Sequence, residues 1–305
     1  MVVTYNRLPL LREALAALGR QNRPVDQILV VDNASTDGTA ASMAADFPNV
    51  TLLRLPENLG SSGGYFAGIR WALAQGFDWI WTLDDDSIAN PAALAALLKA
   101  HESFPQDRKP ELLASKVVWT DGSIHPMNLQ KPKLYDPEAQ ILAAGHSAMS
   151  IRFTSFVSML VSRRVVEKYG LPVAGYFMWN DDVEYAGRIL RNELGVLVPA
   201  SVVCHKTARK HVPATSVGGK FYFEVRNKLW ILRHSIAFSR EEKWWMAKSL
   251  VRRTWKHLVD ARFGSASLAG VMRGIADGVC RKPAEGSANI IGIEQGPQRA
   301  EARAA

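Results

Sequence analysis

The sequence predicts an α/β fold, in which a mostly parallel sheet is flanked by helices and followed by a C-terminal helical extension. Short apolar runs rich in Val, Ile and Leu alternate with segments of helical periodicity along residues 1–104. This alternation is typical of parallel strands joined by helices. Basic segments with helical spacing follow over residues 220–262. The composition, 48% hydrophobic and 22% charged, is ordinary for a globular protein with a sizeable core.

Each expected element of the first half follows from its own residues. We expect strands where apolar and β-branched residues run together, at 1–6, 27–32, 50–55 and 79–83. Helices are expected where apolar residues recur at helical spacing, at 8–21, 60–76, 90–104 and in the later part of 33–47. Pro9 suits a first helical turn, and Gly76 suits a helix end. Asn90 is placed to cap the fourth helix, with Pro91 at its first position.

The second half is less regular. We expect a strand and hairpin over 112–126, a loop over 126–146, and a strand leading into a helix over 150–170. The remaining expected elements are a helix over 181–195, a strand over 196–205, and helices over 220–238 and 241–262. We therefore divide the chain into an α/β domain, a basic helical region and a small, polar, disordered tail, at 1–210, 211–282 and 283–305.

Cysteine usage and the N-terminus indicate a compartment. Cys204 and Cys280 are the only cysteines, too few for a disulfide framework or a thiolate zinc site. No apolar run reaches the roughly 18 residues of a membrane-spanning helix, and the N-terminus lacks the pattern of a secretion signal. We therefore expect a cytoplasmic protein. The chain begins with MVVTYNR, already inside the first expected strand, so either the given start is late or this strand is short.

The net charge of +8 is unevenly distributed. Residues 1–204 hold 18 Lys and Arg against 21 Asp and Glu, a net charge of −3. Residues 205–282 hold 17 Lys and Arg against 5 Asp and Glu, a net charge of +12. This basic region is typical of proteins with an anionic partner, such as nucleic acid, phosphorylated lipid or a membrane surface. A solvated basic face is the alternative.

Three consecutive carboxylates, Asp84, Asp85 and Asp86, follow the expected strand at 79–83. Adjacent negative charges repel, so their placement at the end of a buried strand indicates a neutralising cation. Mg²⁺ and Mn²⁺ take oxygen ligands and commonly bridge substrate phosphates. The first and third Asp of such a D-x-D pattern can reach one ion if the turn folds back. A solvated loop with helix-capping Asp residues is the alternative.

Candidate ligand-binding groups follow other expected strands, at the edge where ligands bind in parallel sheets. Asp32 could accept hydrogen bonds from a nucleobase imide or from ribose hydroxyls, or could serve only as a turn or cap residue. Asn58 begins the segment NLGSSGG, whose Gly63 and Gly64 allow close backbone approach to a ligand. The helix that starts there favours anions. The segment is neither a Walker loop nor a dinucleotide-binding motif.

The remaining candidates lie further along the chain. The segment WNDDVEY, residues 179–185, places Asp181 and Asp182 at the start of an expected helix. One of them could act as a general base, and helix capping by Asp181 is the alternative. His205 ends the strand expected at 196–205, where it is a candidate nitrogen ligand or a structural histidine.

Together these motifs resemble family 2 glycosyltransferases of the GT-A fold over about residues 1–210. They occur in the order VVTYNR, ILVVDNASTDGT, NLGSSGGYFAGIRWAL, WTLDDD, WNDDVEY and VVCH. The segments around the triple Asp and FMWNDDVEYAGRI are most similar to those of bacterial galactofuranosyltransferases of cell-wall polysaccharide assembly, and rhamnosyltransferases share much of the pattern. The resemblance implies inverting transfer of galactofuranose from UDP-galactofuranose, or of rhamnose from dTDP-rhamnose. The acceptor would be a hydroxyl of a glycan or a lipid-linked molecule.

The resemblance also implies roles on the donor side. The residues expected around the nucleotide are Thr4, Arg7 and Asp32, and Asp85 would flank the donor. The residues expected to hold Mn²⁺ or Mg²⁺ against the donor diphosphate are Asp84, Asp86 and His205.

On the acceptor side, the resemblance implies a catalytic base at Asp182 and an acceptor-lining role for Trp179. Asn180 stands where some relatives carry an acid, which leaves Asp181 open as the alternative base.

The expected helix at 241–262 carries Trp and aliphatic residues on one face, with Lys248, Arg252 and Lys256 beside them. That face consists of Trp244, Ala247, Val251, Trp255, Leu258 and Val259. Such a face suits a membrane interface with anionic headgroups, and peripheral contact with the inner face of the plasma membrane would bring the enzyme to a lipid-linked acceptor. Packing of the same face against the α/β domain is the alternative.

Two other function classes are weaker. A sugar nucleotidyltransferase would also need carboxylates and a metal, but the first strand leads into TYNR and not into a Gly-rich basic loop for a triphosphate. A nucleic-acid-binding protein would explain the basic region, but no reading motif is present. Without a metal, the acidic cluster would also repel phosphate. We therefore expect no nucleic-acid partner.

Overall fold

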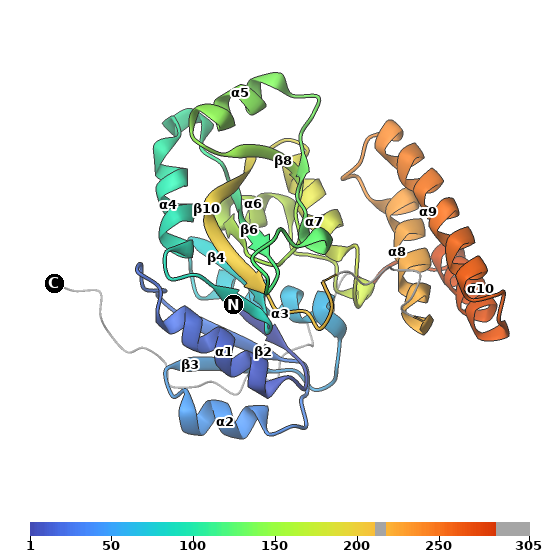
Figure 1. Ribbon diagram of the computed structural model, residues 1–305, viewed down its shortest axis with the longest axis horizontal. Helices are drawn as coiled ribbons and strands as arrows, with labels where there is room; N and C mark the ends of the chain where they lie inside the picture. Colours follow the sequence, from blue (N-terminus) through green and yellow to red (C-terminus); the bar gives the residue numbers. More distant parts are fainter. Residues whose placement is uncertain (211–217, 285–305) are drawn as a thin grey trace.

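The first half of the chain forms the alternating strands and helices expected from its sequence (Figure 1). The computed structural model describes residues 1–210 and 218–284. In chain order the elements are β1 (Val2–Thr4), α1 (Leu8–Gly19), β2 (Ile28–Asp32), α2 (Thr39–Asp46), β3 (Val50–Arg54), α3 (Gly60–Ala74) and β4 (Trp79–Asp84). The α/β class is therefore confirmed.

The described residues form one ten-stranded sheet in the order β3-β2-β1-β4-β9-β6-β10-β8-β7, with β5 paired to β10. Its later strands are β5 (Ser87–Ala89), β6 (Leu112–Val118), β7 (Lys131–Pro132), β8 (Met149–Phe153), β9 (Met159–Ser162) and β10 (Gly195–His205). The first four strands are parallel. Strand β9 is antiparallel to both of its neighbours, β4 and β6, so β6 runs in the same direction as the first four strands. Strand β10 is parallel to β6 and shares this direction. The carboxyl ends of the first four strands, β6 and β10 therefore lie toward one edge of the sheet.

Helices cover both faces of the sheet because consecutive strand side chains point to opposite sides. In β1, Val3 belongs to an apolar cluster that includes residues of α3, α6 (Arg163–Tyr169) and α7 (Asp181–Leu190). Its neighbour Val2 belongs to the cluster on the other face, which includes residues of α1, α2 and α4 (Ala93–Ser103). The apolar residues of the strands are therefore buried on both sides, as the near-continuous apolar runs of the sequence require.

The start of α4 differs from expectation. Asn90 is not the capping residue: the helix begins at Ala93, and its N-cap is Ala92, without a side-chain hydrogen bond. The reason is the strand β5, which the sequence did not reveal. Directly after β5, the amide of Asn90 still donates to the carbonyl of Val202 in β10, at 3.0 Å. The free amide of Leu94 instead donates to Oε1 of Gln21, at 3.1 Å. A side chain from the turn after α1 thus replaces the local cap.

Two further expectations in the middle of the chain were wrong. The loop expected over 126–146 contains α5 (Pro137–Gly145), which Asp136 caps by accepting from the amide of Ala139, at 3.0 Å. The single strand expected before α6 is two strands, β8 and β9. Short 3₁₀ turns occur at Gln106–Arg108, Pro126–Asn128, Ala174–Tyr176 and Gly218–Lys220.

The C-terminal region is helical, as expected, and contains α8 (Phe221–His234), α9 (Arg240–Asp260) and α10 (Ser265–Cys280). Ser239 and Glu242 form a reciprocal capping box at the start of α9. The third helix was not expected, because its glycines lower helix propensity. They allow close packing instead: a Cβ on Gly274 would lie 3.0 Å from the carbonyl oxygen of Tyr222, and one on Gly278 would lie 2.7 Å from Cβ of Leu229 in α8. Most of the tail expected to be disordered, 283–305, lies outside the described residues.

A small apolar core holds these helices together, and a second one joins them to the sheet. Phe221, Val225, Leu250 and Val271 form the first cluster. The second contains Tyr176, Ile231, Ala237 and Phe238, with Met246 packed against it. Figure 1 shows the three helices grouped beside the α/β layers. In the described part of the chain, no helix has the length and apolarity needed to cross a bilayer.

Candidate active site

Candidate residues gather where the parallel strands end. Thr4, Asp32 and Asp84 are the last residues of β1, β2 and β4, and His205 is the last residue of β10. The short strand β5 pairs with the end of β10, with Ser87 opposite His205. Because β5 follows directly on the three carboxylates, this pairing brings Asp86 beside the histidine. The site therefore lies at the edge of the sheet where parallel α/β proteins bind ligands.

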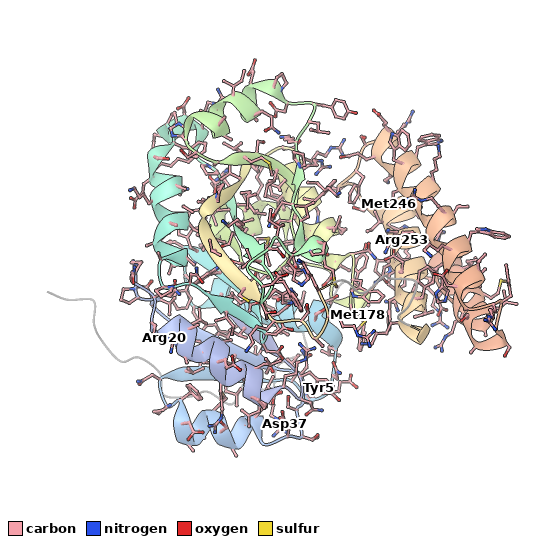
Figure 2. The ribbon with its side chains drawn as sticks, in the orientation of Figure 1. Tyr5, Arg20, Asp37, Met178, Met246 and Arg253 are labelled. Carbon is pink, nitrogen blue, oxygen red and sulfur yellow. The ribbon has the colours of Figure 1, made fainter. Side chains whose placement is uncertain are left out.

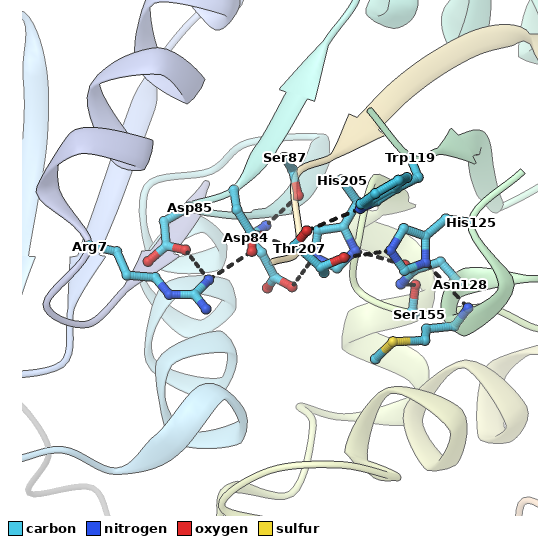
Figure 3. A network of polar contacts seen from close by, with 12 residues as sticks. Arg7, Asp84, Asp85, Ser87, Trp119, His125, Asn128, Ser155, His205 and Thr207 are labelled. Carbon is cyan, nitrogen blue, oxygen red and sulfur yellow. Dashed lines mark hydrogen bonds and ion pairs between the residues drawn. The ribbon is translucent and has the colours of Figure 1, made fainter. Parts of the chain in front are cut away.

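Asp85 connects two of the residues expected around the nucleotide. Thr4 Oγ1 donates to Asp85 Oδ2 at 2.8 Å. Arg7 Nη1 donates to Asp85 Oδ1 at 3.2 Å (Figure 3). Arg7 also donates to Asp86 Oδ2 at 2.7 Å. Burial raises the pKa of Asp85 to about 6, although the charge of Arg7 opposes this shift. Arg7 therefore neutralises part of the acidic cluster while half of its side chain remains exposed.

Asp84 is held by a residue that the sequence did not reveal. Tyr65, a buried residue of α3, donates from its hydroxyl to Asp84 Oδ1. Burial raises the pKa of Asp84, and the nearby charge of Asp86 raises it further. An aromatic residue on a helix that packs on the sheet looks like an ordinary core residue in the sequence, and only the fold shows its hydroxyl at the carboxylate.

Asp86 and His205 form the buried part of a candidate metal site. His205 Nε2 lies 2.9 Å from Asp86 Oδ1 and 3.8 Å from Asp84 Oδ2. Ligand atoms of these three residues all lie within 4.8 Å of one another. Burial opposes charge on both partners, but their mutual attraction, with Arg7 beside Asp86, lowers the pKa of Asp86. The same attraction raises the pKa of His205.

The ring of His205 is oriented so that Nε2 can bind a cation. Its Nδ1 lies 2.8 Å from Asn128 Oδ1, an acceptor, so Nδ1 carries the proton. Asn128 is oriented in turn by donating from Nδ2 to Ser155 Oγ at 3.0 Å. Nε2 therefore faces Asp86 Oδ1, a buried atom with no other hydrogen-bond donor among the described residues. Without a metal, a proton on Nε2 can bridge the two atoms, in keeping with the raised pKa of His205. When Nε2 is deprotonated, its lone pair and the carboxylate together fit a divalent metal.

The other donor-side candidates lie nearby but differ in their surroundings. Asp32 is fully buried, and its Oδ1 accepts from the amide of Ser35 at 2.9 Å. Its Oδ2 has no hydrogen bond within the described residues and lies 3.7 Å from Arg54 Nε. Asn58 Oδ1 accepts from the amide of Gly60 at 2.9 Å, so it orders the turn before α3. Asp32 thus keeps a free acceptor atom at the end of β2.

Gly63 and Gly64 contact protein atoms closely. A Cβ on Gly64 would lie 2.5 Å from Cγ1 of Val3 and 2.9 Å from Nδ2 of Asn33. One on Gly63 would lie 2.4 Å from Cβ of Leu59. Gly64 therefore permits the close approach of α3 to β1 and to the residue after β2, and Gly63 leaves room for the side chain of Leu59, the N-cap residue of α3. This packing brings the first turn of α3 up to the site.

The two candidate bases differ in exposure and contacts. Asp181 is only 4% exposed, and its Oδ2 accepts from Ser62 Oγ at 2.7 Å. Asp182 is half-buried, and its Oδ1 accepts from the amide of Val183 at 2.7 Å. Burial raises the pKa of Asp181 to about 6, and burial together with the charge of Asp181 raises that of Asp182 to about 8. Ser62 and Tyr65, about one turn apart on α3, bind Asp181 and Asp84, so the start of α7 lies close to the acidic cluster.

The alternative that Asp181 caps α7 is wrong. The N-cap is Asn180, in the left-handed conformation with φ 67°, and it makes no capping side-chain bond. Trp179, the expected acceptor-lining residue, precedes it with φ 63° and is half-buried. Asp181 and Asp182 are therefore the first helical residues, where the positive end of the helix favours negative charge.

The described residues contain another cavity, of about 150 Å³, at the opposite end of the strands. It is lined mainly by apolar side chains, among them Leu29, Trp71 and Trp79. Trp79 begins β4, the strand that ends with Asp84. This cavity is therefore remote from the carboxylates and contributes nothing to their chemistry.

Fold, site and sequence comparisons together define the class: the protein is a glycosyltransferase. More narrowly, the chain belongs to glycosyl transferase family 2, whose model matches residues 1–168. The match covers the strands β1 to β9 and includes the three carboxylates.

Among curated proteins, the chain is similar to the galactofuranosyltransferase GlfT1 of Mycobacterium tuberculosis. The two are 28% identical over 251 residues, which cover 76% of this chain and 81% of the relative. It is also 28% identical, over 239 residues, to an N-acetylglucosaminyl-diphospho-decaprenol L-rhamnosyltransferase of the same species. That match covers 68% of this chain and 75% of the relative.

Solved structures support the GT-A fold. S. aureus TarS 1-349 in complex with UDP-GlcNAc matches with a TM-score of 0.58 at 15% identity, covering 91% of this chain and 79% of that one. The mannosyltransferase PcManGT from Pyrobaculum calidifontis, in complex with GDP-Man and Mn²⁺, matches with a TM-score of 0.52 at 17% identity. The match covers 90% of this chain and 72% of that one. At these identities the likeness shows the fold alone.

Proposed function

We propose that the protein is an inverting, metal-dependent galactofuranosyltransferase that uses UDP-galactofuranose. Its acceptor would be a hydroxyl of a glycan or lipid-linked molecule in cell-wall or polysaccharide synthesis. The observation that carries the proposal is the cluster of Asp84, Asp86 and His205, whose ligand atoms lie within 4.8 Å of one another at the carboxyl edge of the sheet. Similarity to GlfT1 supports the choice of sugar. Similarity to a rhamnosyltransferase supports dTDP-rhamnose as the second candidate donor.

On the donor side, this chain's residues bind and orient the nucleotide. Asp32 offers a buried, unbonded carboxylate oxygen to a nucleobase imide or ribose hydroxyl. Thr4 and Arg7 hold the carboxylate of Asp85 by hydrogen bonds. The exposed part of Arg7 can bind a phosphate oxygen of the donor. Asn58 orders the turn that begins α3, whose first turn packs closely through Gly63 and Gly64.

Asp84, Asp86 and His205 would hold the divalent ion, Mn²⁺ or Mg²⁺. When bound, the ion supplies Lewis-acid stabilisation of the charge that develops on the departing diphosphate. Tyr65 holds one oxygen of Asp84, and Asn128 holds Nδ1 of His205. These contacts set the two ligands before any ion arrives, which reduces the rearrangement that binding requires.

Asp182 would accept the proton of the acceptor hydroxyl. It is more exposed than Asp181, which is occupied by Ser62, and its raised pKa suits proton transfer near neutral pH. The acceptor oxygen then attacks the anomeric carbon from the face opposite the nucleotide, and the bond to the diphosphate oxygen breaks. One displacement inverts the anomeric configuration, so no enzyme nucleophile is required. Trp179, directly before the segment that carries the base, would line the acceptor site.

A panel of nucleotide-sugars tests this function. With Mn²⁺ or Mg²⁺ present, UDP-galactofuranose should bind and be slowly hydrolysed or transferred, while other donors are used poorly. Preference for dTDP-rhamnose would instead identify the protein as a rhamnosyltransferase. Release of pyrophosphate from a sugar phosphate and a nucleoside triphosphate would instead identify a nucleotidyltransferase. Salt-sensitive DNA binding without donor use would identify a nucleic-acid-binding protein.

We also propose the division at about residue 210 between the transferase domain and the basic helical region, with membrane contact as a role of the latter. The α9 face expected from the sequence is largely exposed: Trp244, Val251, Trp255 and Val259 are 57%, 71%, 63% and 47% exposed. The exceptions are Ala247, which is half-buried, and Leu258, which packs in the core between the helices. Lys248 Nζ lies 5.2 Å from the ring centres of both Trp244 and Trp245. Exposed aromatic rings flanked by cations suit an anionic membrane surface and a lipid-linked acceptor.

Vesicle binding should therefore depend on the Trp face of α9. The protein should bind vesicles containing phosphatidylglycerol and bind pure phosphatidylcholine far less, and added salt should weaken binding because surface charges are screened. Replacing Trp244 and Trp255 together by Ser should weaken binding by ~10-fold or more, since both rings lose their apolar contact. Cosedimentation measures this.

The matched control is Tyr135→Ser, which removes an aromatic residue that is 89% exposed outside the helical region. It should bind vesicles like the wild type. Equal binding to neutral and anionic vesicles would contradict the proposal. A dimer that the Trp substitutions dissociate, without vesicle binding, would identify a second copy of the chain as the partner of this face.

A further inference from the structure

The segment before α7 has an unusual backbone. Phe177, Trp179 and Asn180 have φ values of 66°, 63° and 67°, although none of them is glycine. Around Phe177 the chain makes a γ-turn, in which the amide of Met178 donates to the carbonyl of Tyr176 at 2.8 Å. Such conformations persist only where the surrounding structure holds them, and they often occur at functional sites. Asp181 and Asp182 follow immediately.

On one side, α8 holds this segment through Asn227. The side chain of Asn227 is fully buried, and its Nδ2 donates to the carbonyl oxygens of Tyr176, Met178 and Trp179, at 3.1, 2.7 and 2.9 Å. Its Oδ1 accepts from Nε of Arg226 at 2.9 Å, which fixes the orientation of the amide. One side chain therefore bonds to three backbone carbonyls of the irregular segment, in addition to the γ-turn bond that the carbonyl of Tyr176 accepts.

A second residue of α8 holds the end of the segment. Glu224, 4% exposed, accepts from Asn180 Nδ2 on its Oε2 at 3.1 Å. Its Oε1 lies 2.7 Å from Lys228 Nζ and 3.0 Å from Nη1 of Arg253, which comes from α9. The buried carboxylate is thus neutralised by cations of α8 and α9. In Figure 2, Met178 of the segment and Arg253 mark the facing sides of the domain and the helices.

On its other side, the Phe177–Asn180 segment packs closely against the start of α3. A Cβ on Gly60 would lie 1.9 Å from the carbonyl oxygen of Phe177, and the amide of Ser62 donates to that oxygen at 3.2 Å. Ser62 Oγ also donates to Asp181. The segment is therefore enclosed between α3, which begins at the donor side of the site, and α8.

We propose that Asn227 and Glu224 are positioning residues for the acceptor half of the active site. By holding the Phe177–Asn180 segment against α3, they set the place of Asp182 and Trp179 relative to the carboxylates that follow β4. The C-terminal helices are then part of the catalytic machinery and do more than contact a membrane. For the roles of Asp182 and Trp179, this inference rests on the proposed function.

The test compares the full-length wild type with Asn227→Leu, which keeps the side-chain size but removes the donors, and with the milder Glu224→Gln. We expect kcat to fall ~10- to 100-fold in Asn227→Leu, because small displacements of a reacting group have effects of this size. Dissociation constants for Mn²⁺ and for the donor should stay unchanged, since the metal ligands are untouched. Glu224→Gln should show the same pattern with a smaller loss. Unchanged kcat in both variants would overturn the proposal.

Hydrogen exchange provides a readout that does not depend on activity. In Asn227→Leu, the amides of residues 181–185 should exchange ~10-fold faster, while those of β4 stay unchanged. The matched controls are Asn192→Leu and Glu241→Gln, both at exposed positions, and they should behave like the wild type. A wild type that transfers no sugar would refute the proposed function, whereas unchanged exchange at 181–185 would refute the positioning role.

Discussion

Asp86→Asn should abolish metal-dependent donor binding. The substitution keeps the shape of the side chain but replaces a buried carboxylate oxygen, which faces His205 Nε2 at 2.9 Å, by a neutral group. Losing one charged ligand of three should weaken Mn²⁺ binding ~100-fold or more, about 2.8 kcal/mol, because metal sites lose 10- to 100-fold even when only a supporting group is removed. Calorimetric titration with Mn²⁺, with and without UDP, measures this loss.

The protein itself should remain folded, with a somewhat lower melting temperature. Removing the charge of Asp86 relieves its repulsion of Asp84 but loses its attraction to Arg7 and His205. In a thermal melt, Mn²⁺ should raise the melting temperature of the wild type, because a ligand that binds the native state stabilises it. It should leave that of Asp86→Asn unchanged. Asp107→Asn, at an exposed position in a 3₁₀ turn, is the control and should respond like the wild type. An Mn²⁺ affinity in Asp86→Asn equal to that of the wild type would exclude this metal site.

Most of the residues clustered at the ends of the strands could be predicted from the sequence. Asp32, Asp84 and His205 each end an apolar run, and parallel strands bring such ends to one edge of a sheet. What it lacked was the short strand β5, which sets Asp86 directly beside His205. Three residues after a turn carry too little pattern to be recognised as a strand, and the pairing depends on β10, more than 100 positions further along the chain.

The residues that support the site could not be predicted from the sequence, for a different reason. Tyr65, Asn128 and Asn227 act through hydrogen bonds to groups distant in sequence, and nothing in their neighbours signals this. A buried Tyr on a helix and an Asn after a hairpin are common for structural reasons alone. Periodicity predicts which residues are buried, but the partner of a buried polar group follows only from the tertiary fold. Residues that orient the chemistry are therefore harder to predict than those that perform it.

Comparing variants of Asp181 and Asp182, at the start of α7, should identify which of the two is the catalytic base. Asp182→Asn should lower kcat by ~10³-fold, since general-base catalysis commonly contributes 10² to 10⁴. It should leave donor and Mn²⁺ binding unchanged, because Asp182 is not among the metal-site residues. Asp181→Asn should have a smaller effect, since this carboxylate is buried and accepts from Ser62. Single-turnover transfer separates binding from chemistry, and the reverse ranking of the variants would assign the base to Asp181.

The pH dependence of the wild type gives an independent measure of the same group. Only the ionised form of Asp182 can accept the acceptor's proton, and burial together with the charge of Asp181 raises its pKa to about 8. Below that value the protonated acid predominates, so kcat should rise with pH and level off above it. A metal ion at Asp84 would move the midpoint down, because its positive charge offsets a carboxylate that contributes to the shift. In Asp182→Asn the residual kcat should lose this rise, and a rise that persists unchanged would mean that another group takes the proton.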